Sequence, residues 1–514
     1  MSYLFNDAAA LAVAFTVSLM AWLFGGSRAD ALLPVVPWAL IILVEVAFCF
    51  PQRHAGESTY EARARVWSAL LHSPVFWVSV GLLALLLVPL ANDGLCPSCD
   101  AAAIAEGISA APPIPFLPFC VDRAEHLNVV LWFAVALVTT VATAHCLTRA
   151  GKRLVLKAIV WNGVALALLG FVQGAMKAPG PLWTTLADGR PYGDFFATFG
   201  YPNIAGDYFT TLFGLAVALW RDQREEPWRS HLPQATSAGP GKGKSDGWFW
   251  HRHYYLLPAA VFYFAAINTL SRAAIVLVTA LAVIFFAHAL VVSLWRMDKS
   301  RRVSVGVWSL VVFGLVVFYA SISMPSRIHR EVGTLDALET LDRVTGKSQY
   351  HAEVATAIWQ DHPLFGCGGW GYRHLCCGKM QELGVDLKGL QMVGGANVHN
   401  DYLQFLAEHG LVGFGAMVAL AVLLLVPVVR AWRRLVAGLR FRKIKDLPPR
   451  PMTIFVLPAP AFVILLTLLA TLIHAFGDCP LRSSAVLSLF YVALAAIPGF
   501  LPRQEKGASV RPVG

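Results

Sequence analysis

LVGFGAMVALAVLLLVPVV (411–429) is an apolar run without a charged side chain, and basic residues begin directly after it at Arg430. A helix needs about 20 predominantly apolar residues to cross the hydrocarbon core of a bilayer. The run therefore predicts a membrane-spanning helix that ends at a basic membrane surface.

Similar runs occur along most of the chain. Hydrophobic residues make up 57% of the 514 residues and charged residues only 14%, against roughly 25% charged residues in soluble proteins. We predict an all-α polytopic transmembrane bundle of about twelve spans. The other predicted spans cover residues 8–25, 31–50, 74–91, 127–147, 154–175, 204–220, 254–270, 273–295, 303–324, 453–475 and 484–501.

Basic residues separate the two sides of this bundle. The net charge is +10, but Lys and Arg cluster in alternate loops, which favours a membrane protein and excludes nucleic acid as the expected partner. The positive-inside rule places the basic loops and both termini in the cytoplasm. It also requires a hairpin at Leu270–Arg272, because without it the later loops would change sides.

The longest predicted external segment lies before the tenth span. We divide the chain into nine helices over residues 1–324, an external cap over 325–410, three further helices over 411–501 and a cytoplasmic tail over 502–514. Residues 336–343 and 350–361 have helical spacing, and Ala352, Ala355, Ile358 and Trp359 share one face. We expect that face to pack against the bundle.

A glycine-rich turn follows at HPLFGCGGWG (362–371). Its G-x-G-x-x-G spacing follows a helix and opens no βαβ unit, so we reject a dinucleotide site. Two interpretations stay open. The backbone N–H groups could bind an anion, or the turn could simply close the preceding helix.

The string NVHNDYLQFLAEHG (397–410) predicts a short amphipathic helix. Asn400 is a suitable N-cap and Gly410 a suitable C-terminal stop, and Tyr402 lies on the apolar face. His399 stands just before the cap, where a side chain points away from the helix axis. A lone histidine is more often structural, so the pattern alone favours a working histidine only mildly.

Arg190 and Arg272 lie on the same predicted external side as His399. A guanidinium group binds phosphate oxygens in a bidentate manner, so the pair suggests a diphosphate-bearing lipid. The alternatives are snorkelling to lipid phosphate for Arg272 and a solvated loop for Arg190. His145 and His474, near or within spans, are predicted to be hydrogen-bond partners between helices.

Seven cysteines fall on the external side, which is an oxidising compartment. We expect disulfides within 96–120 and within 367–377. A metal site built from Cys367, Cys376 and Cys377 with His362 or His374 is a weaker alternative. We predict no metal and no cofactor.

Four segments together resemble the O-antigen ligase family. VHNDYLQFLAEHGLVG (398–413) is similar to its histidine signature, and the other recurring elements follow in the expected order. These are RPYGDFFATFGYPNIAGDY (190–208), TLSRAA (269–274) and HPLFGCGGWGY (362–372). Two departures from the family pattern are Gly200-Tyr201 ahead of Pro-Asn and the Cys-rich insertion near 376–395.

The resemblance implies a membrane glycosyltransferase of a bacterial inner membrane, with its active site facing the periplasm. The donor would be an undecaprenyl-diphosphate-linked glycan, used without metal or nucleotide sugar. The acceptor would be lipid A core, a glycan or a protein. His399 would activate the acceptor hydroxyl, and Arg190 and Arg272 would hold the diphosphate. We expect further substrate contacts from Asn203, Arg343, Asn400 and Tyr402.

Three alternatives remain at this point. An O-antigen polymerase of the same family would share these motifs. A secondary transporter or flippase for an anionic or lipid-linked solute would need charged or broken helices in the membrane. The cap could also serve only to bind a partner protein.

Overall fold

The computed structural model describes residues 2–93, 114, 116–186, 188–229, 253–295, 303, 306, 307, 314, 350–384, 397–440 and 457–502. These residues form helices and no β-strand. Their elements, in chain order, are α1 (Ser2–Trp22), η1 (Phe24–Gly26), α2 (Ala29–Leu32), α3 (Val36–Val44), η2 (Glu45–Cys49), α4 (Thr59–Leu71), α5 (Pro74–Leu87), η3 (Val88–Ala91), α7 (Arg123–Val141), η4 (Ala142–Cys146), α8 (Arg149–Ala175), η5 (Pro181–Trp183), α9 (Pro202–Arg229), α11 (Leu256–Asn268), α12 (Arg272–Trp295), α16 (Gly371–Glu382), α18 (Asp401–Arg440), α19 (Ala459–Gly477), η7 (Pro480–Arg482), α20 (Ser484–Ala496) and η8 (Ile497–Gly499).

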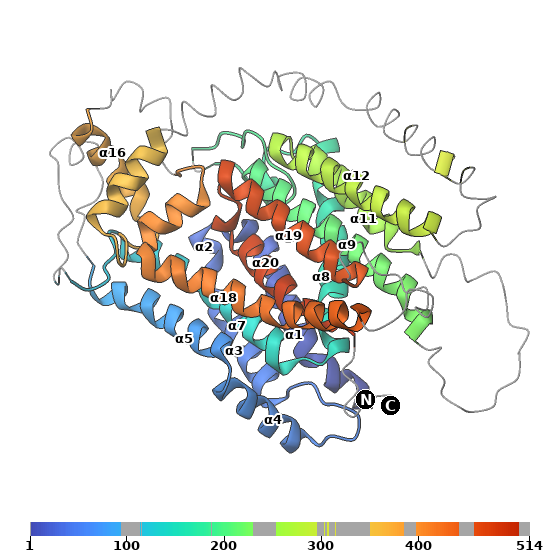
Figure 1. Ribbon diagram of the computed structural model, residues 1–514. Helices are drawn as coiled ribbons and strands as arrows, with labels where there is room; N and C mark the ends of the chain where they lie inside the picture. Colours follow the sequence, from blue (N-terminus) through green and yellow to red (C-terminus); the bar gives the residue numbers. More distant parts are fainter. Residues whose placement is uncertain are drawn as a thin grey trace, which may run out of the picture.

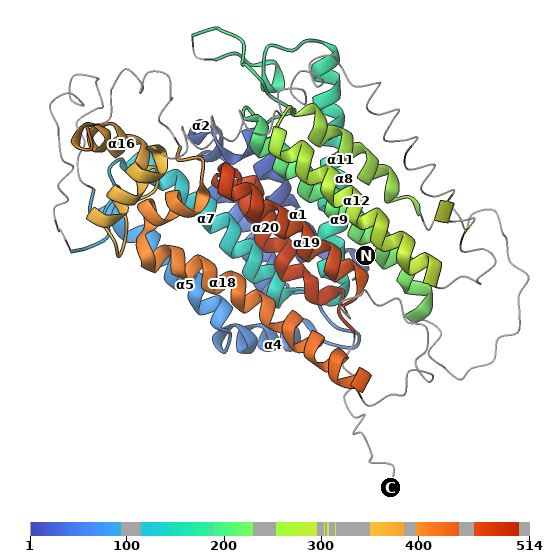
Figure 2. The same ribbon diagram turned by 45° about the horizontal axis from the view of Figure 1, so that its top comes forward.

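The helices form a bundle (Figures 1 and 2). Within the described residues, 6 helices are long and apolar enough to cross a membrane, and shorter apolar helices occupy Asn6–Trp22, Val36–Cys49, Leu256–Asn268 and Ser484–Gly499. This confirms an all-helical, multi-pass membrane protein. The predicted span 303–324 and the predicted helix 336–343 lie largely outside the described residues.

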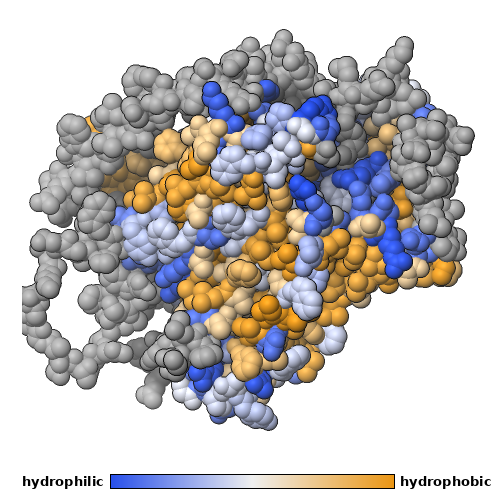
Figure 3. Space-filling view, turned by 180° about the vertical axis from the view of Figure 1, so that it is seen from behind, coloured by the Kyte–Doolittle hydropathy of each residue, from blue (hydrophilic) through white to orange (hydrophobic). Residues whose placement is uncertain are grey.

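α20 forms the centre of the bundle. All of its residues are buried, and it packs against α1, α7, α8, α9, α18 and α19. Outer helices instead keep large apolar side chains exposed, including Phe15, Trp38 and Leu257. Much of the described surface seen from behind is apolar (Figure 3), as expected for helices that face lipid.

The start of α1 and the ends of several helices meet at one end of the bundle. Gln52 donates to Asp7 at 2.7 Å and accepts from the Thr148 backbone N–H at 2.9 Å. Arg65 donates to the Gln52 carbonyl, and Arg149 donates to the Leu501 carbonyl at 2.8 Å. Segments around residues 52–65 and 148–149 therefore lie together with both ends of the described chain.

The described part of the cap has an apolar core of its own. Val354, Ala355 and Ile358 of helix 350–361 are buried against Tyr372 and Met380 of α16. The face predicted from helical spacing is therefore a packing surface, but it packs mainly within the cap.

The glycine-rich turn docks on the segment that carries the histidine motif. Cys367 and Gly368 donate their backbone N–H groups to the carbonyls of Ala407 and Glu408, at 3.0 and 2.8 Å. Gly369 donates to His126 Nδ1, and Trp370 donates to Glu408 Oε2. These donors are already used, so the anion-binding interpretation was wrong and the turn is a packing element.

Gly410 breaks the long element α18 with φ 61° and ψ −171°. A Cβ at this position would overlap the Leu364 backbone, and Leu411 and Val412 donate to the carbonyls of Pro363 and Leu364. The prediction that Gly410 ends the helix begun at Asn400 is confirmed. The chain then resumes as the apolar run 411–429.

The prediction of a disulfide within 367–377 is wrong, because no disulfide bond joins any two of Cys367, Cys376 and Cys377. Cys376 and Cys377 are consecutive residues of α16, with their Sγ atoms 4.0 Å apart, and helical geometry does not bring adjacent residues to bonding distance. Cys120 is also free, whereas Cys96 and Cys99 lie outside the described residues.

Candidate active site

Asp478 is the centre of a polar cluster at the bundle end where α19 finishes. Its carboxylate accepts from the Cys479 backbone N–H at 2.7 Å and from the Tyr201 hydroxyl at 3.1 Å. Asn203 Nδ2 also donates to Asp478 Oδ2. Two segments distant in the sequence therefore meet at one buried carboxylate.

His399 faces the same carboxylate. Its Nδ1 lies 3.4 Å from Asp478 Oδ1, and 41% of its side chain is exposed. This is a long hydrogen bond, of the kind that tightens when substrate binds. Nδ1–H directed at a carboxylate leaves Nε2 to accept a proton.

The local sequence fixes this orientation. Asn400 caps the following helix by accepting from the Leu403 N–H at 3.1 Å, which confirms the predicted N-cap. Val398 donates to Gln404 Oε1 at 3.0 Å. Between these anchors His399 takes φ 55°, a left-handed conformation that is uncommon outside glycine and is concentrated at functional sites.

The pair stabilises the charged forms of both groups. The hydrogen bond to Asp478 raises the pKa of His399 above its ordinary value, although burial acts in the opposite direction. Burial is the strongest influence on Asp478 and opposes its ionisation, but the hydrogen bond and charge of His399, the charge of His474 and the Cys479 N–H together outweigh burial and lower the Asp478 pKa. The carboxylate is therefore ionised at neutral pH, and His399 retains its proton to a higher pH than a free imidazole.

Asn203 is thus brought to His399 through Asp478. It lies in the first turn of α9, and Gly206 in the same turn packs against Ser271 and Ala274. A side chain at position 206 would collide with this hairpin. Arg272 is the exposed first residue of α12, directly after Ser271. The hairpin predicted at Leu270–Arg272 is confirmed and stands against the helix that positions Asn203.

Arg190 lies in the loop between α8 and α9. Its guanidinium pairs with Asp188 at 2.5 Å, and 77% of its side chain is exposed. Tyr192, two residues later, is held by a backbone hydrogen bond to Pro179 at 2.7 Å. Arg190 is therefore at the surface of an anchored loop and is engaged by an intraloop carboxylate.

The remaining predicted contacts divide into two groups. The Tyr402 hydroxyl donates to the Leu472 carbonyl at 2.7 Å, and its ring lies 4.4 Å from that of Phe476. Asn400 uses its side-chain oxygen as a cap. Both residues hold the helix after His399 in place. Arg343 lies outside the described residues.

A second buried pair lies beside the site. His474 Nδ1 is 3.1 Å from Asp207 Oδ1, and Thr471 donates to Asp207 Oδ2 at 3.0 Å. His474 therefore joins α19 to α9, as predicted for an interhelical partner. His145 likewise bonds Ser73 at 2.9 Å.

A buried ion pair joins the cap to the bundle. Arg482 donates to Glu408 at 2.5 Å, and both side chains are almost fully buried. The Arg482 guanidinium lies 4.1 Å from the centre of the Trp370 ring, so a cation–π contact adds to the ion pair. Glu408 thereby connects the helix after His399 with both the glycine-rich turn and η7.

His399, Asp478 and Cys479 each place a possible metal-ligating atom within 4.8 Å of one another. His399 and Cys479 each contact Asp478, and the Cys479 thiol lies 3.3 Å from Asp478 Oδ1. The Asp478 carboxylate is the hydrogen-bond acceptor of this cluster.

Sequence reasoning missed Asp478 and Tyr201. Asp478 follows a predicted span and lies 79 positions from His399 in the chain, so no spacing rule connects them. The available signal was a carboxylate at the external end of an apolar run, where charge is costly and tends to be functional. Tyr201 lay within a quoted motif but was treated only as a departure from the family pattern.

One comparison with known proteins matches part of the chain. No curated protein matches the chain. Residues 257–418 match a family described as O-antigen ligase, and the matched region includes the Arg272 hairpin, the glycine-rich turn and His399. Over these residues, the chain is similar to the O-antigen ligase family.

Proposed function

We propose that this protein transfers a glycan from a polyprenyl-diphosphate carrier to an acceptor hydroxyl at the periplasmic face of a bacterial inner membrane. The observation that carries the proposal is the contact of His399, which lies within the region matched by the O-antigen ligase family, with Asp478, which lies after that region. A histidine with a partner carboxylate is suited to general-base chemistry. The proposed orientation has both termini in the cytoplasm.

In the proposed reaction, the acceptor O–H gives its proton to His399 Nε2 as its oxygen attacks the anomeric carbon. The bond from that carbon to the diphosphate breaks, and the polyprenyl diphosphate leaves with the electron pair. One displacement of this kind inverts the anomeric centre. Asp478 orients the imidazole and stabilises the imidazolium that forms.

Arg272 and Arg190 are proposed to stabilise the negative charge on the leaving diphosphate. The position of Arg272 beside the α9 turn that carries Asn203 supports this role. Arg190 would have to exchange Asp188 for the diphosphate. Asn203 and Tyr201 hold Asp478 and are positioning residues.

The test is transfer by purified His399→Ala and His399→Gln variants, with a polyprenyl-diphosphate-linked glycan and its acceptor. Both variants should lose transfer while they keep normal protein levels and monodisperse behaviour in detergent. His54→Ala, at an exposed histidine that hydrogen-bonds Glu57 through its backbone, is the matched control. Full activity of the His399 variants would refute the role given to His399.

A gene deletion separates ligase from polymerase. Loss of a ligase should leave free polyprenyl-linked polymer, whereas loss of a polymerase should leave single repeat units on the acceptor. The buried Asp207–His474 pair is a feature that transporters also have. Uptake of an anionic solute into vesicles, unaffected by His399→Ala, would favour that alternative over the enzyme.

A further inference from the structure

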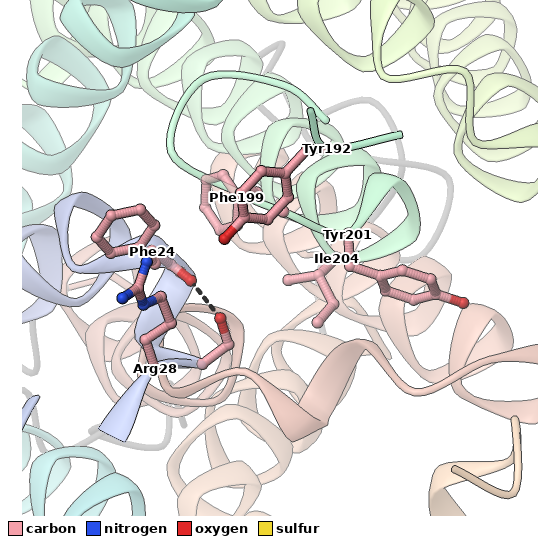
Figure 4. A pocket seen from close by; sticks show the side chains of 9 residues that line it. Phe24, Arg28, Tyr192, Phe199, Tyr201 and Ile204 are labelled. Atoms are coloured by element: carbon pink, nitrogen blue, oxygen red, sulfur yellow. Dashed lines mark hydrogen bonds between the residues drawn. The ribbon is translucent and has the colours of Figure 1, made fainter. Parts of the chain in front are cut away.

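A cavity of about 250 Å³ opens beside the Asp478 cluster. Phe24, Arg28, Tyr192, Phe199 and Tyr201 contribute to its wall (Figure 4). Its size is below the roughly 300–1,000 Å³ of pockets for drug-sized ligands. A single ring suits it better than an extended chain.

The wall combines aromatic faces with hydrogen-bonding groups. Arg28 and Tyr192 point toward one another across the cavity in Figure 4, and the Arg28 guanidinium lies 4.6 Å from the centre of the Phe24 ring. Arg28 also donates to Asp30 through two nitrogen atoms, at 3.0 and 2.5 Å. The guanidinium charge is therefore largely compensated, which disfavours a multiply charged anion.

One wall of the cavity is a turn in which Phe24 holds a strained backbone conformation. Phe24, Gly25 and Gly26 all have positive φ, of 55°, 67° and 73°. A Cβ at Gly25 would lie 2.5 Å from Phe199 Cδ1, so glycine is required there. Ser483 donates to the Gly25 carbonyl at 2.5 Å, which ties the strained turn to η7. Such strain is retained mostly at functional sites.

Tyr201 connects the cavity to the catalytic groups. It lines the wall, while in Figure 4 its ring leads away from the cavity. Its hydroxyl donates to Asp478, the partner of His399. A ligand in the cavity is thus separated from the proposed base by a short chain of hydrogen-bonded groups.

We propose that this cavity binds one pyranose ring of the glycan that takes part in transfer. Apolar C–H faces of the sugar would lie on Tyr192 and Phe24, and its hydroxyl groups would bond Arg28 and Tyr192. The inference rests on the proposed function, because it assigns the ring to a reacting glycan. The same chemistry could come from the donor or from the acceptor.

Sugar binding is tested without the transfer reaction. Saturation-transfer NMR on the full-length protein in nanodiscs uses the methyl pyranosides of glucose, galactose, mannose and N-acetylglucosamine. At least one sugar should receive saturation. The signal should fall several-fold in Tyr192→Leu and persist in His399→Ala. Tyr60→Leu, at an exposed tyrosine of α4, is the matched control.

Equal signals in the wild type and Tyr192→Leu, or no signal for any of the sugars, would overturn the proposal. Binding of inorganic pyrophosphate that depends on Arg28, without sugar binding, would identify an anion site instead and also overturn it. Sugar binding that persists in a protein with no transferase activity would leave the cavity assignment intact and remove only the proposed function.

The source of the ring follows from kinetics. Tyr192→Leu should raise the KM of the substrate that supplies the ring by about tenfold, with little change in kcat, because one stacking face is lost. A higher donor KM assigns the ring to the donor, and a higher acceptor KM assigns it to the acceptor. Unchanged values of both KM would refute a pyranose site.

Discussion

Replacement of Asp478 by Asn tests the arrangement of the candidate site most directly. The shape of the side chain is retained, but one of its two acceptor oxygens becomes an NH2 donor. His399 and the Cys479 N–H point at Oδ1, and Asn203 points at Oδ2. In either orientation of the amide, at least one donor therefore faces another donor.

The size of the effect follows from the role of His399. General-base catalysis contributes about 10²–10⁴-fold, and this range bounds the loss from misplacing the imidazole. Since His399 stays present and partly exposed, we expect transfer by Asp478→Asn to fall by about 10²-fold, at the lower end of that range.

The pH dependence of transfer activity provides an independent test of the same role. The base acts when His399 is neutral, so activity rises with pH through the His399 pKa, which Asp478 raises. Removal of the carboxylate charge lowers that pKa, and the rising limb should move to lower pH. The ratio of wild-type to variant activity should therefore shrink as the pH falls.

The assay measures initial transfer rates from pH 5 to 9 with saturating donor and acceptor. Asp361→Asn, at a cap carboxylate that pairs with Lys379, is the control and should match the wild type. A variant with wild-type rates, or a rising limb that stays in place or moves to higher pH, would refute the proposed role of Asp478.

Three further predictions concern stability and metal dependence. Gly410→Ala should lower the thermal unfolding midpoint in detergent far more than Gly56→Ala. Backbone strain costs about 1–3 kcal/mol at either site. The added methyl group at position 410 also collides with the Leu364 backbone, whereas at position 56 it meets no other atom. Equal midpoints for the two variants would contradict this packing. Glu408→Gln should destabilise the protein by about 3–5 kcal/mol, because Arg482 is left buried without its partner, and an unfolding titration with no change would show that the pair is not formed. Treatment with EDTA should leave the transfer rate unchanged, because His399 and Cys479 already contact Asp478 directly. Loss of activity that zinc restores would show a metal centre at the cluster.

The sequence predicted the fold well because hydropathy is a local signal. The apolar runs around 74–91, 127–147 and 154–175 are helices in the structure, and the breaks at Asn400 and Gly410 follow from the backbone preferences of those residues.

Only the site residues that belong to a recognisable sequence motif were predicted. His399 stood out from its neighbours, whereas Asp478 and Tyr201 become functional only through contacts between distant segments. The glycine-rich turn shows the opposite error. In the sequence its backbone N–H groups looked available to bind an anion. In the structure the N–H groups of Cys367 and Gly368 donate to the backbone carbonyls of Ala407 and Glu408.

The crowded carboxylate of Asp478 also determines how a catalytic cycle would close. The carboxylate accepts hydrogen bonds from His399, Tyr201, Asn203 and the Cys479 backbone. It therefore stays deprotonated and does not take the proton that the acceptor loses. That proton would have to remain on the imidazole until water at the exposed side of His399 or the departing diphosphate removes it. In the proposed orientation, each round of transfer would therefore pass one proton to the periplasmic solvent or to the departing diphosphate, and the next acceptor could be activated only after that release.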